Sequence, residues 1–161
     1  MYKELKKQIT THSARIGVVG LGYIGLPLAV EFAKAGFSIL GFDIQALKVR
    51  KVNQGTNYIR DINQTEFRRL VKQKRLAATG DFARLRNMDC IVICVPTPLN
   101  KSKDPDVSHI LQITDNIRQY RRPGQFISLE STTYPGTTRE LVLPKLLNGK
   151  FQVGKNFFLA Y

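Results

Sequence analysis

Three glycines, Gly20, Gly22 and Gly25, form a G-x-G-x-x-G pattern inside an otherwise apolar stretch, RIGVVGLGYIGLPLAVEF. The pattern follows a short run of β-branched residues and opens a helix-like run. In that setting the first glycine permits a tight turn, the second lets the backbone approach a pyrophosphate, and the third allows close packing of helix against strand. Because N–H groups at the start of a helix bind phosphates, the pattern predicts a dinucleotide site.

The acidic residue Asp43 ends the next apolar run, FSILGFD, at the place where such folds bind the adenosine ribose. A carboxylate there accepts hydrogen bonds from both ribose hydroxyls and repels a 2′-phosphate, which favours NAD over NADP. Lys48 follows closely and could tolerate such a phosphate, but we expect Asp43 to dominate. A simpler interpretation stays open, in which the glycines form only a packing turn and Asp43 caps the next helix.

Apolar runs alternate with helix-like segments along the chain. We expect strands at 15–20, 37–43, 76–79, 89–96 and 125–131, and helices at 24–34, 45–54, from 63 onward, 106–120 and 137–147. Asn63 and Thr65 are candidate N-caps, and the last helix should bend or end near Pro144. The strand runs are mostly continuous and apolar, as in strands covered on both faces. We therefore predict an α/β fold, a Rossmann-like doubly wound parallel sheet with helices on both faces.

The two ends of the chain depart from this alternation. Residues 1–14 are expected to form a flexible N-terminal arm in which His12 is inert, and residues 15–161 a single cofactor-binding domain. The apolar run KNFFLAY is strand-like and stops at Tyr161 without a turn or polar tail. We therefore expect the protein to continue beyond Tyr161.

Charge and composition argue against several classes of protein. The formal net charge is +13, but lysine and arginine are spread along the chain without an aromatic-interleaved patch or a nucleic-acid motif. The longest apolar stretch is interrupted by Glu31 and Lys34, and the N-terminus lacks the apolar region of a signal peptide. We expect a cytoplasmic protein with no nucleic-acid partner, no membrane partner and no metal site.

Four motifs occur in order along the chain: GLGYIGLPLAVEFAKAGF, GFD, ICVPTPL and LESTTYPGTT. With them, the chain from about Lys7 to Tyr161 closely resembles the NAD-binding half of the UDP-glucose/GDP-mannose dehydrogenase family. The resemblance implies oxidation of the C6 hydroxyl of a nucleotide-linked sugar to a carboxylate in two NAD-dependent steps, by a full-length homodimer. VPTPL and ESTTYPGTT are most similar to the UDP-N-acetyl-hexosamine 6-dehydrogenase branch, which serves capsule and O-antigen synthesis. The favoured substrates are UDP-N-acetylglucosamine and UDP-N-acetylgalactosamine, with UDP-glucose and GDP-mannose as alternatives.

The resemblance also implies roles for individual positions. They are the dinucleotide loop Gly20, Leu21, Gly22, Tyr23, Ile24 and Gly25; the ribose acid Asp43; Lys48 on the adenosine side; Val95, Pro96 and Thr97 beside NAD; and Ser131 and Thr132 near the nicotinamide. Thr132 is implied to help order a water for the hydrolytic step. The segments VPTP and ESTT both lie at the carboxyl ends of predicted strands, where open α/β sheets bind ligands. The alternatives are that Pro96 and Pro98 only end a strand and that Thr132 only caps the next helix.

Two further residues lie close to these motifs. Glu130 could position a water or a cationic partner near a nicotinamide, although a role as a simple strand-end residue is equally consistent with the sequence. His109 falls within a predicted helix without a second histidine nearby, and we interpret it as a surface or packing residue.

The two cysteines, Cys90 and Cys94, share one predicted strand, where we expect both to be buried. We expect them to be free thiols, because residues four apart in a strand lie about 13 Å from each other, too far for a disulfide. They cannot supply the family's nucleophile, which must be an accessible thiolate and belongs to a segment beyond Tyr161, as do the central helix and substrate domain. We therefore expect this chain to bind NAD without turnover.

Two other classes of protein remain as alternatives. A 2-hydroxyacid or 3-hydroxyacyl dehydrogenase would explain the glycine loop and Asp43 but not VPTPL or ESTTYPGTT. An NAD-binding module without chemistry of its own would explain all of these motifs, and it predicts that the natural protein ends near Tyr161.

Overall fold

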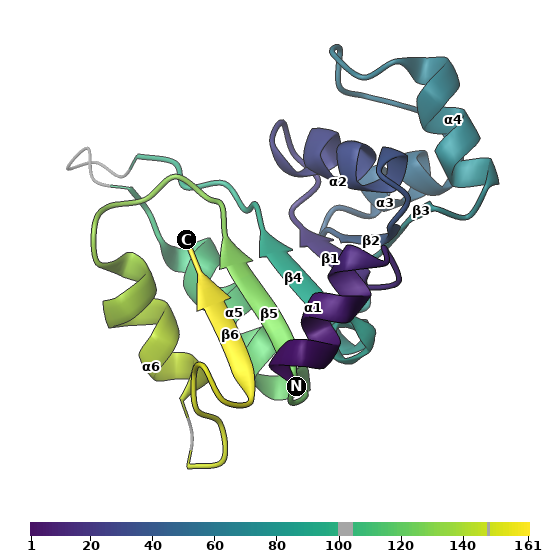
Figure 1. Cartoon of the computed structure of the whole chain (residues 1–161). Helices are drawn as coiled ribbons and strands as arrows, with labels where there is room; N and C mark the ends of the chain where they lie inside the picture. The colour runs from purple at the N-terminus through teal and green to yellow at the C-terminus, as the bar shows by residue number, and fades with distance from the viewer. Residues whose placement is uncertain (100–104, 148) are drawn as a thin grey trace.

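The computed structural model describes residues 1–99, 105–147 and 149–161. Within them, six parallel strands form one sheet in the order β3-β2-β1-β4-β5-β6 (Figure 1). The strands are β1 Arg15–Val19, β2 Ser38–Phe42, β3 Leu76–Thr79, β4 Cys90–Ile93, β5 Gln125–Leu129 and β6 Phe157–Ala160. This order confirms the predicted doubly wound, Rossmann-like sheet, and it places the switch in strand order between β1 and β4.

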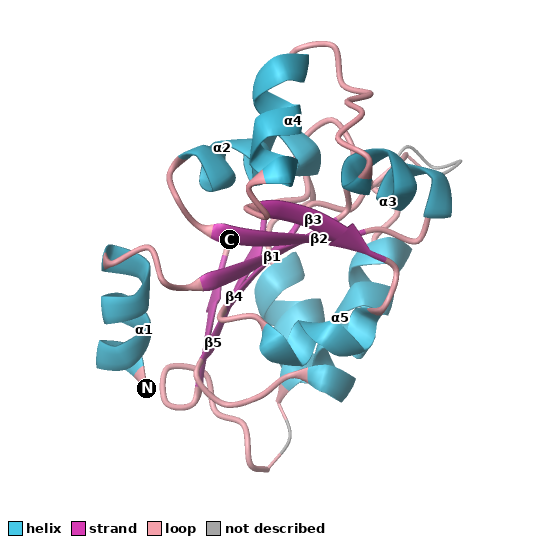
Figure 2. Cartoon of the chain, turned by 90° about the vertical axis from the view of Figure 1, so that its right-hand side faces the viewer, coloured by secondary structure: helices cyan, strands magenta, loops and turns pink. Residues whose placement is uncertain are grey.

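Helices cover both faces of the sheet (Figure 2). One face carries α2 Gly25–Lys34, α3 Ala46–Asn53 and α4 Gln64–Lys72, and the other carries α5 Ser108–Tyr120, α6 Leu143–Leu146 and a 3₁₀-helix at Phe82–Asn87. Asn63 is the N-cap of α4, because its Oδ1 accepts a hydrogen bond from the Glu66 N–H at 3.0 Å. No helix among the described residues is long and apolar enough to cross a membrane.

Strand β4 explains why the apolar runs are continuous. Cys90 and Val92 point into the hydrophobic core on the α2 face, whereas Ile91 and Ile93 point into the core on the α5 face. Successive side chains of a strand point to opposite sides, so a strand buried on both sides needs an apolar residue at every position. The same argument applies to β1, which lies next to β4.

The N-terminal segment is a helix, α1 Tyr2–Thr10, and not the flexible arm expected from the sequence. Its Leu5 is buried in the core on the α2 face, and the Tyr2 ring lies 5.9 Å from the ring of Phe158 in β6. His12 follows the helix, with its ring 4.7 Å from that of Phe37. Tyr2, Leu5 and Ile9 have the i, i+3, i+7 spacing of one helix face, which the expectation of a flexible arm overlooked, and Leu5 is the one buried residue of α1.

The last helical segment is irregular and ends close to Pro144, as expected from the sequence. Residues Thr137–Val142 form a π-helix that continues into α6, and α6 ends at Leu146, shortly after Pro144. In a regular α-helix the proline ring would clash with the carbonyl four residues earlier, and the wider π-helical turns relieve that clash.

Candidate cofactor site

A cleft of about 710 Å³ opens at the carboxyl ends of β1 and β4, where the strand order switches. Most of the residues singled out in the sequence line it: Gly20, Gly22, Tyr23, Ile24, Asp43, Lys48, Val95, Pro96, Thr97, Glu130, Ser131 and Thr132. Leu21 and Gly25 are buried and do not line it. The fold therefore brings four separate segments of the chain to one place, in the crevice where open α/β sheets bind ligands.

The three glycines of the loop differ in what surrounds them. At Gly20, φ is +94° and a Cβ would lie 2.5 Å from the Cys94 carbonyl oxygen. At Gly25, a Cβ would lie 1.7 Å from the Gly20 carbonyl oxygen, so the loop and the start of α2 are in direct contact. At Gly22, no atom lies within 4 Å of where a Cβ would be. Gly20 and Gly25 thus make the loop possible, and Gly22 leaves its cleft-facing backbone bare.

The N-terminus of α2 can receive an anion. Ile24 is its N-cap and makes no side-chain capping hydrogen bond, and the first turn holds no acidic residue. The Leu26 N–H already donates to the Gly22 carbonyl oxygen at 3.1 Å and Pro27 has no N–H, so the donors that remain for an anion are the amides of residues 22–25, where the helix dipole adds positive potential. Together with the bare backbone at Gly22, this arrangement fits a pyrophosphate.

Asp43 is 7% exposed and joins the end of β2 to the glycine loop. Its Oδ2 accepts the Leu21 N–H at 2.9 Å and lies 3.4 Å from Lys48 Nζ, and its Oδ1 accepts the Gln45 N–H at 2.9 Å. The simpler interpretation of Asp43 as a helix cap is wrong, because the N-cap of α3 is Gln45. Oδ2 thus accepts from two donors, whereas Oδ1 accepts from one and keeps a lone pair for a further donor, such as a ribose hydroxyl.

Two hydroxyls tie the loops after β4 and β5 together. Thr97 Oγ1 donates to the Thr132 carbonyl oxygen at 2.6 Å, and Ser131 Oγ donates to the Val95 carbonyl oxygen at 2.8 Å. Thr132 does not cap the following helix, whose N-cap is Gly136 and has no side-chain capping bond. The Ser131 hydroxyl is thus used within the protein, whereas the exposed Thr132 hydroxyl is available to a ligand or water.

Both cysteines are free and buried, in agreement with the sequence. Burial, and to a smaller extent the charge of Glu130, raise the pKa of the Cys94 thiol to about 12. Burial next to Asp89 raises the pKa of Cys90 to about 11. Since the thiolate is the reactive form, neither residue can act as a nucleophile at neutral pH. The Glu130 carboxylate itself accepts a hydrogen bond from the Ser128 hydroxyl.

Several lining residues had no signal in the sequence. Tyr58 and Ile59, from the connection between α3 and α4, reach the cleft, as do Phe42 and Phe82, whose ring centroids are 5.8 Å apart. His109, interpreted as a surface or packing residue, also lines the cleft. An aromatic residue in a turn between helices is not distinctive in sequence, so only the folded chain identifies Tyr58.

A comparison with known protein families shows to which family the chain belongs. Residues 14–160 match the UDP-glucose/GDP-mannose dehydrogenase family, NAD binding domain. The chain belongs to this family. The match covers every cleft-lining segment, and the family resemblance noted in the sequence is thereby confirmed.

Individual dehydrogenases of the family are similar over most of the chain. UDP-N-acetyl-D-glucosamine 6-dehydrogenase of Pseudomonas aeruginosa is 32% identical over 148 residues, which are 91% of this chain and 34% of that protein. Protein CapL of Staphylococcus aureus is 36% identical over 91% of this chain and 34% of that protein. The solved UDP-N-acetyl-mannosamine dehydrogenase Cap5O from Staphylococcus aureus matches with a TM-score of 0.83 and 31% identity, over 91% of this chain and 35% of that one. The chain spans about a third of the length of these relatives.

Proposed function

We propose that this chain is the NAD-binding part of a nucleotide-sugar 6-dehydrogenase that oxidises a UDP-N-acetylhexosamine to the uronic acid. The observation that carries the proposal is the bare backbone at Gly22 beside the uncapped start of α2, with Asp43 at the neighbouring strand end. A cradle of this kind fits a dinucleotide pyrophosphate with its ribose on the carboxylate side. By family resemblance, the product would enter capsule or O-antigen polysaccharide synthesis.

The residues of the chain have separate tasks in this proposal. The amides of the glycine loop, at the positive end of the α2 dipole, hold the pyrophosphate, and Asp43 holds the adenosine ribose, with Lys48 placed beside its carboxylate. Bound NAD supplies the acceptor for the hydride that leaves C6 of the sugar. Val95, Pro96 and Thr97 form the wall beside the cofactor, and Thr132 offers a hydroxyl to a water at the far end. The nucleophilic cysteine belongs to the part of such enzymes that follows this domain, so the isolated chain should bind without turnover.

The choice of NAD over NADP is tested by calorimetric titration of the purified chain with each nucleotide. We expect NAD to bind more tightly, and Asp43→Ala to weaken NAD binding roughly 10- to 100-fold and to abolish the preference, because a charged hydrogen-bond acceptor is lost. Asp43→Asn removes the charge and keeps one oxygen, which can accept from either the Leu21 or the Gln45 N–H but not from both, so its loss of affinity should lie at or below that of Asp43→Ala. The control is Asp115→Ala, a carboxylate outside the cleft that pairs with Lys145. A folded chain that binds neither nucleotide contradicts the proposal.

The sugar is tested with the full-length protein. NADH formation should be fastest with UDP-N-acetylglucosamine or UDP-N-acetylgalactosamine, since relatives that act on UDP-N-acetylhexosamines match 91% of this chain. UDP-glucose and GDP-mannose serve as the comparison substrates. Higher kcat/KM with either of these two would reject the proposed substrate class and leave the cofactor assignment standing.

A further inference from the structure

The backbone of Leu21, in the middle of the glycine loop, is held from two sides. Its N–H donates to Asp43 Oδ2 at 2.9 Å, and its carbonyl oxygen accepts a hydrogen bond from the Tyr58 hydroxyl at 2.8 Å. The Leu21 side chain is fully buried. Thus each of the two peptide groups that flank Leu21 has one polar atom fixed by a side chain from a different part of the fold.

The second of these contacts controls the orientation of Gly22. The Leu21 carbonyl and the Gly22 N–H belong to the same planar trans peptide and point in opposite directions. Wherever the Tyr58 hydroxyl holds the carbonyl, the direction of the Gly22 N–H is therefore set. Without that contact the peptide could rotate, because glycine tolerates a wide range of backbone angles. Gly22 is also the loop glycine whose surroundings are open.

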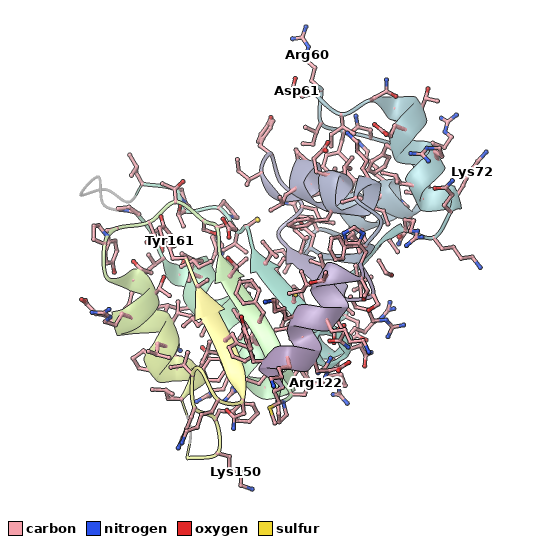
Figure 3. All side chains as sticks on the ribbon, viewed as in Figure 1. Arg60, Asp61, Lys72, Arg122, Lys150 and Tyr161 are labelled. Atoms are coloured by element: carbon pink, nitrogen blue, oxygen red, sulfur yellow. The ribbon has the colours of Figure 1, made fainter. Side chains whose placement is uncertain are left out.

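Tyr58 is presented by a connection that is itself well braced. The Asn57 side chain donates to the carbonyl oxygens of Ile59 and Ile62, at 2.6 and 2.8 Å, and accepts the Ile59 N–H at 2.8 Å. On the other side, Lys51 Nζ lies 5.9 Å from the centre of the Tyr58 ring. Arg60, next along the connection, points away into solvent (Figure 3). The turn thus directs Tyr58 inwards to the glycine loop.

The hydroxyl of Tyr58 stays a donor at neutral pH. Burial, together with the negative charge of Asp43, raises the pKa of Tyr58 well above its ordinary value. A neutral phenol has one proton, and here it is directed at the Leu21 carbonyl.

We propose that Tyr58 is a positioning residue for the cofactor, which holds the Leu21–Gly22 peptide so that the Gly22 N–H faces the phosphates. Tyr58 also lines the cleft, so a direct contact between its hydroxyl and the ligand is a competing explanation for a loss of affinity. The inference rests on the proposed binding of NAD and adds a residue from the α3–α4 connection, outside the motifs found in the sequence.

The test is Tyr58→Phe, which removes the hydroxyl and keeps the ring. Calorimetry should give an NAD dissociation constant roughly 3- to 30-fold weaker than that of the wild-type chain, as expected for one hydrogen bond. The NMR signal of the Gly22 amide, recorded without ligand, should shift or broaden, because the released peptide samples other orientations. Two controls should change neither quantity: Arg60→Ala in the same connection, and Tyr120→Phe, which alters a tyrosine stacked on Arg86 outside the cleft.

The outcomes separate this inference from the proposed function. If the wild-type chain binds NAD and Tyr58→Phe binds it equally well, the inference is wrong and the proposed function stands. If affinity falls while the Gly22 amide signal is unchanged, the Tyr58 hydroxyl acts by contacting the ligand directly and the positioning role is rejected. A lower melting temperature with unchanged NAD affinity means a purely structural role. If the wild-type chain binds no NAD, both the proposed function and the inference fail.

Discussion

Gly25→Ala is expected to abolish NAD binding and to lower the free energy of unfolding by about 1–3 kcal/mol or more, the range for a steric conflict in a packed interior. The new Cβ would lie 1.7 Å from the Gly20 carbonyl oxygen and 3.0 Å from its carbon, so main chain would have to move. In an unhindered helix, alanine is about 1 kcal/mol more favourable than glycine. A loss of stability in Gly25→Ala would therefore be due to the close contact between the loop and α2. Urea unfolding measures the stability, and an NAD titration measures the binding.

Gly22→Ala is the matched control and separates the ligand from the fold. No atom lies within 4 Å of the position of its Cβ, so the stability should change by less than about 0.5 kcal/mol. NAD binding should nevertheless weaken at least about tenfold, because the methyl group would stand where the pyrophosphate approaches the backbone. Unchanged NAD affinity in a folded Gly22→Ala chain would contradict the dinucleotide site. Unchanged stability of Gly25→Ala would contradict the packing seen at the loop.

Asp89→Ala should lower the free energy of unfolding by about 2–4 kcal/mol, because it removes a buried carboxylate that serves two partners. Its Oδ2 accepts the Arg15 N–H at 2.8 Å at the start of β1, and its Oδ1 pairs with the Arg122 guanidinium before β5. The variant leaves the Arg15 N–H without its acceptor and removes the carboxylate partner of Arg122, which keeps the carbonyl oxygens of Arg86 and Pro123, at the end of the sheet away from the cleft. Urea unfolding measures the loss, and NAD affinity of the folded fraction should stay unchanged.

Asp115→Ala provides the comparison for a surface carboxylate. Asp115 is paired with Lys145 at 2.8 Å, but both side chains are substantially exposed to solvent. An exposed ion pair contributes about 0–1 kcal/mol, so the loss should be clearly smaller than that of Asp89→Ala. Equal losses in the two variants would show that burial of Asp89 does not govern its contribution.

The strands and most helices could be predicted from the sequence because their burial leaves a local pattern. At Cys90–Ile93 every residue is apolar since neighbours enter opposite cores, and at Gln64–Lys72 the cap Asn63 marks the start of the helix. Helix α1 has such a pattern in Tyr2, Leu5 and Ile9, but it was overlooked because the segment is otherwise polar and only Leu5 is buried. The π-helical turns before Pro144 had no local signal beyond the proline itself.

The candidate site was predictable where a residue type is tied to a local backbone requirement. Gly20 and Gly25 are positions where a Cβ is sterically excluded, and their spacing alone indicated the loop. Ser131, expected beside the nicotinamide, lines the cleft, but the sequence did not indicate that its hydroxyl donates to the Val95 carbonyl oxygen at the junction of two loops. That partner belongs to the loop after β4 and is not visible in the local sequence.

The sequence by itself determined the fold class, the glycine loop, the acid at the end of β2 and the resemblance to nucleotide-sugar dehydrogenases. These features could be recognised in short segments, because burial and steric exclusion restrict which residue types each segment can contain. Only the tertiary structure decided which side chains brace the site. Tyr58 and Leu21 are separated by 37 positions, and Arg122 and Asp89 by 33. Such contacts depend on the path of the connecting turns, and a hydrogen bond forms only where distance and direction are both satisfied.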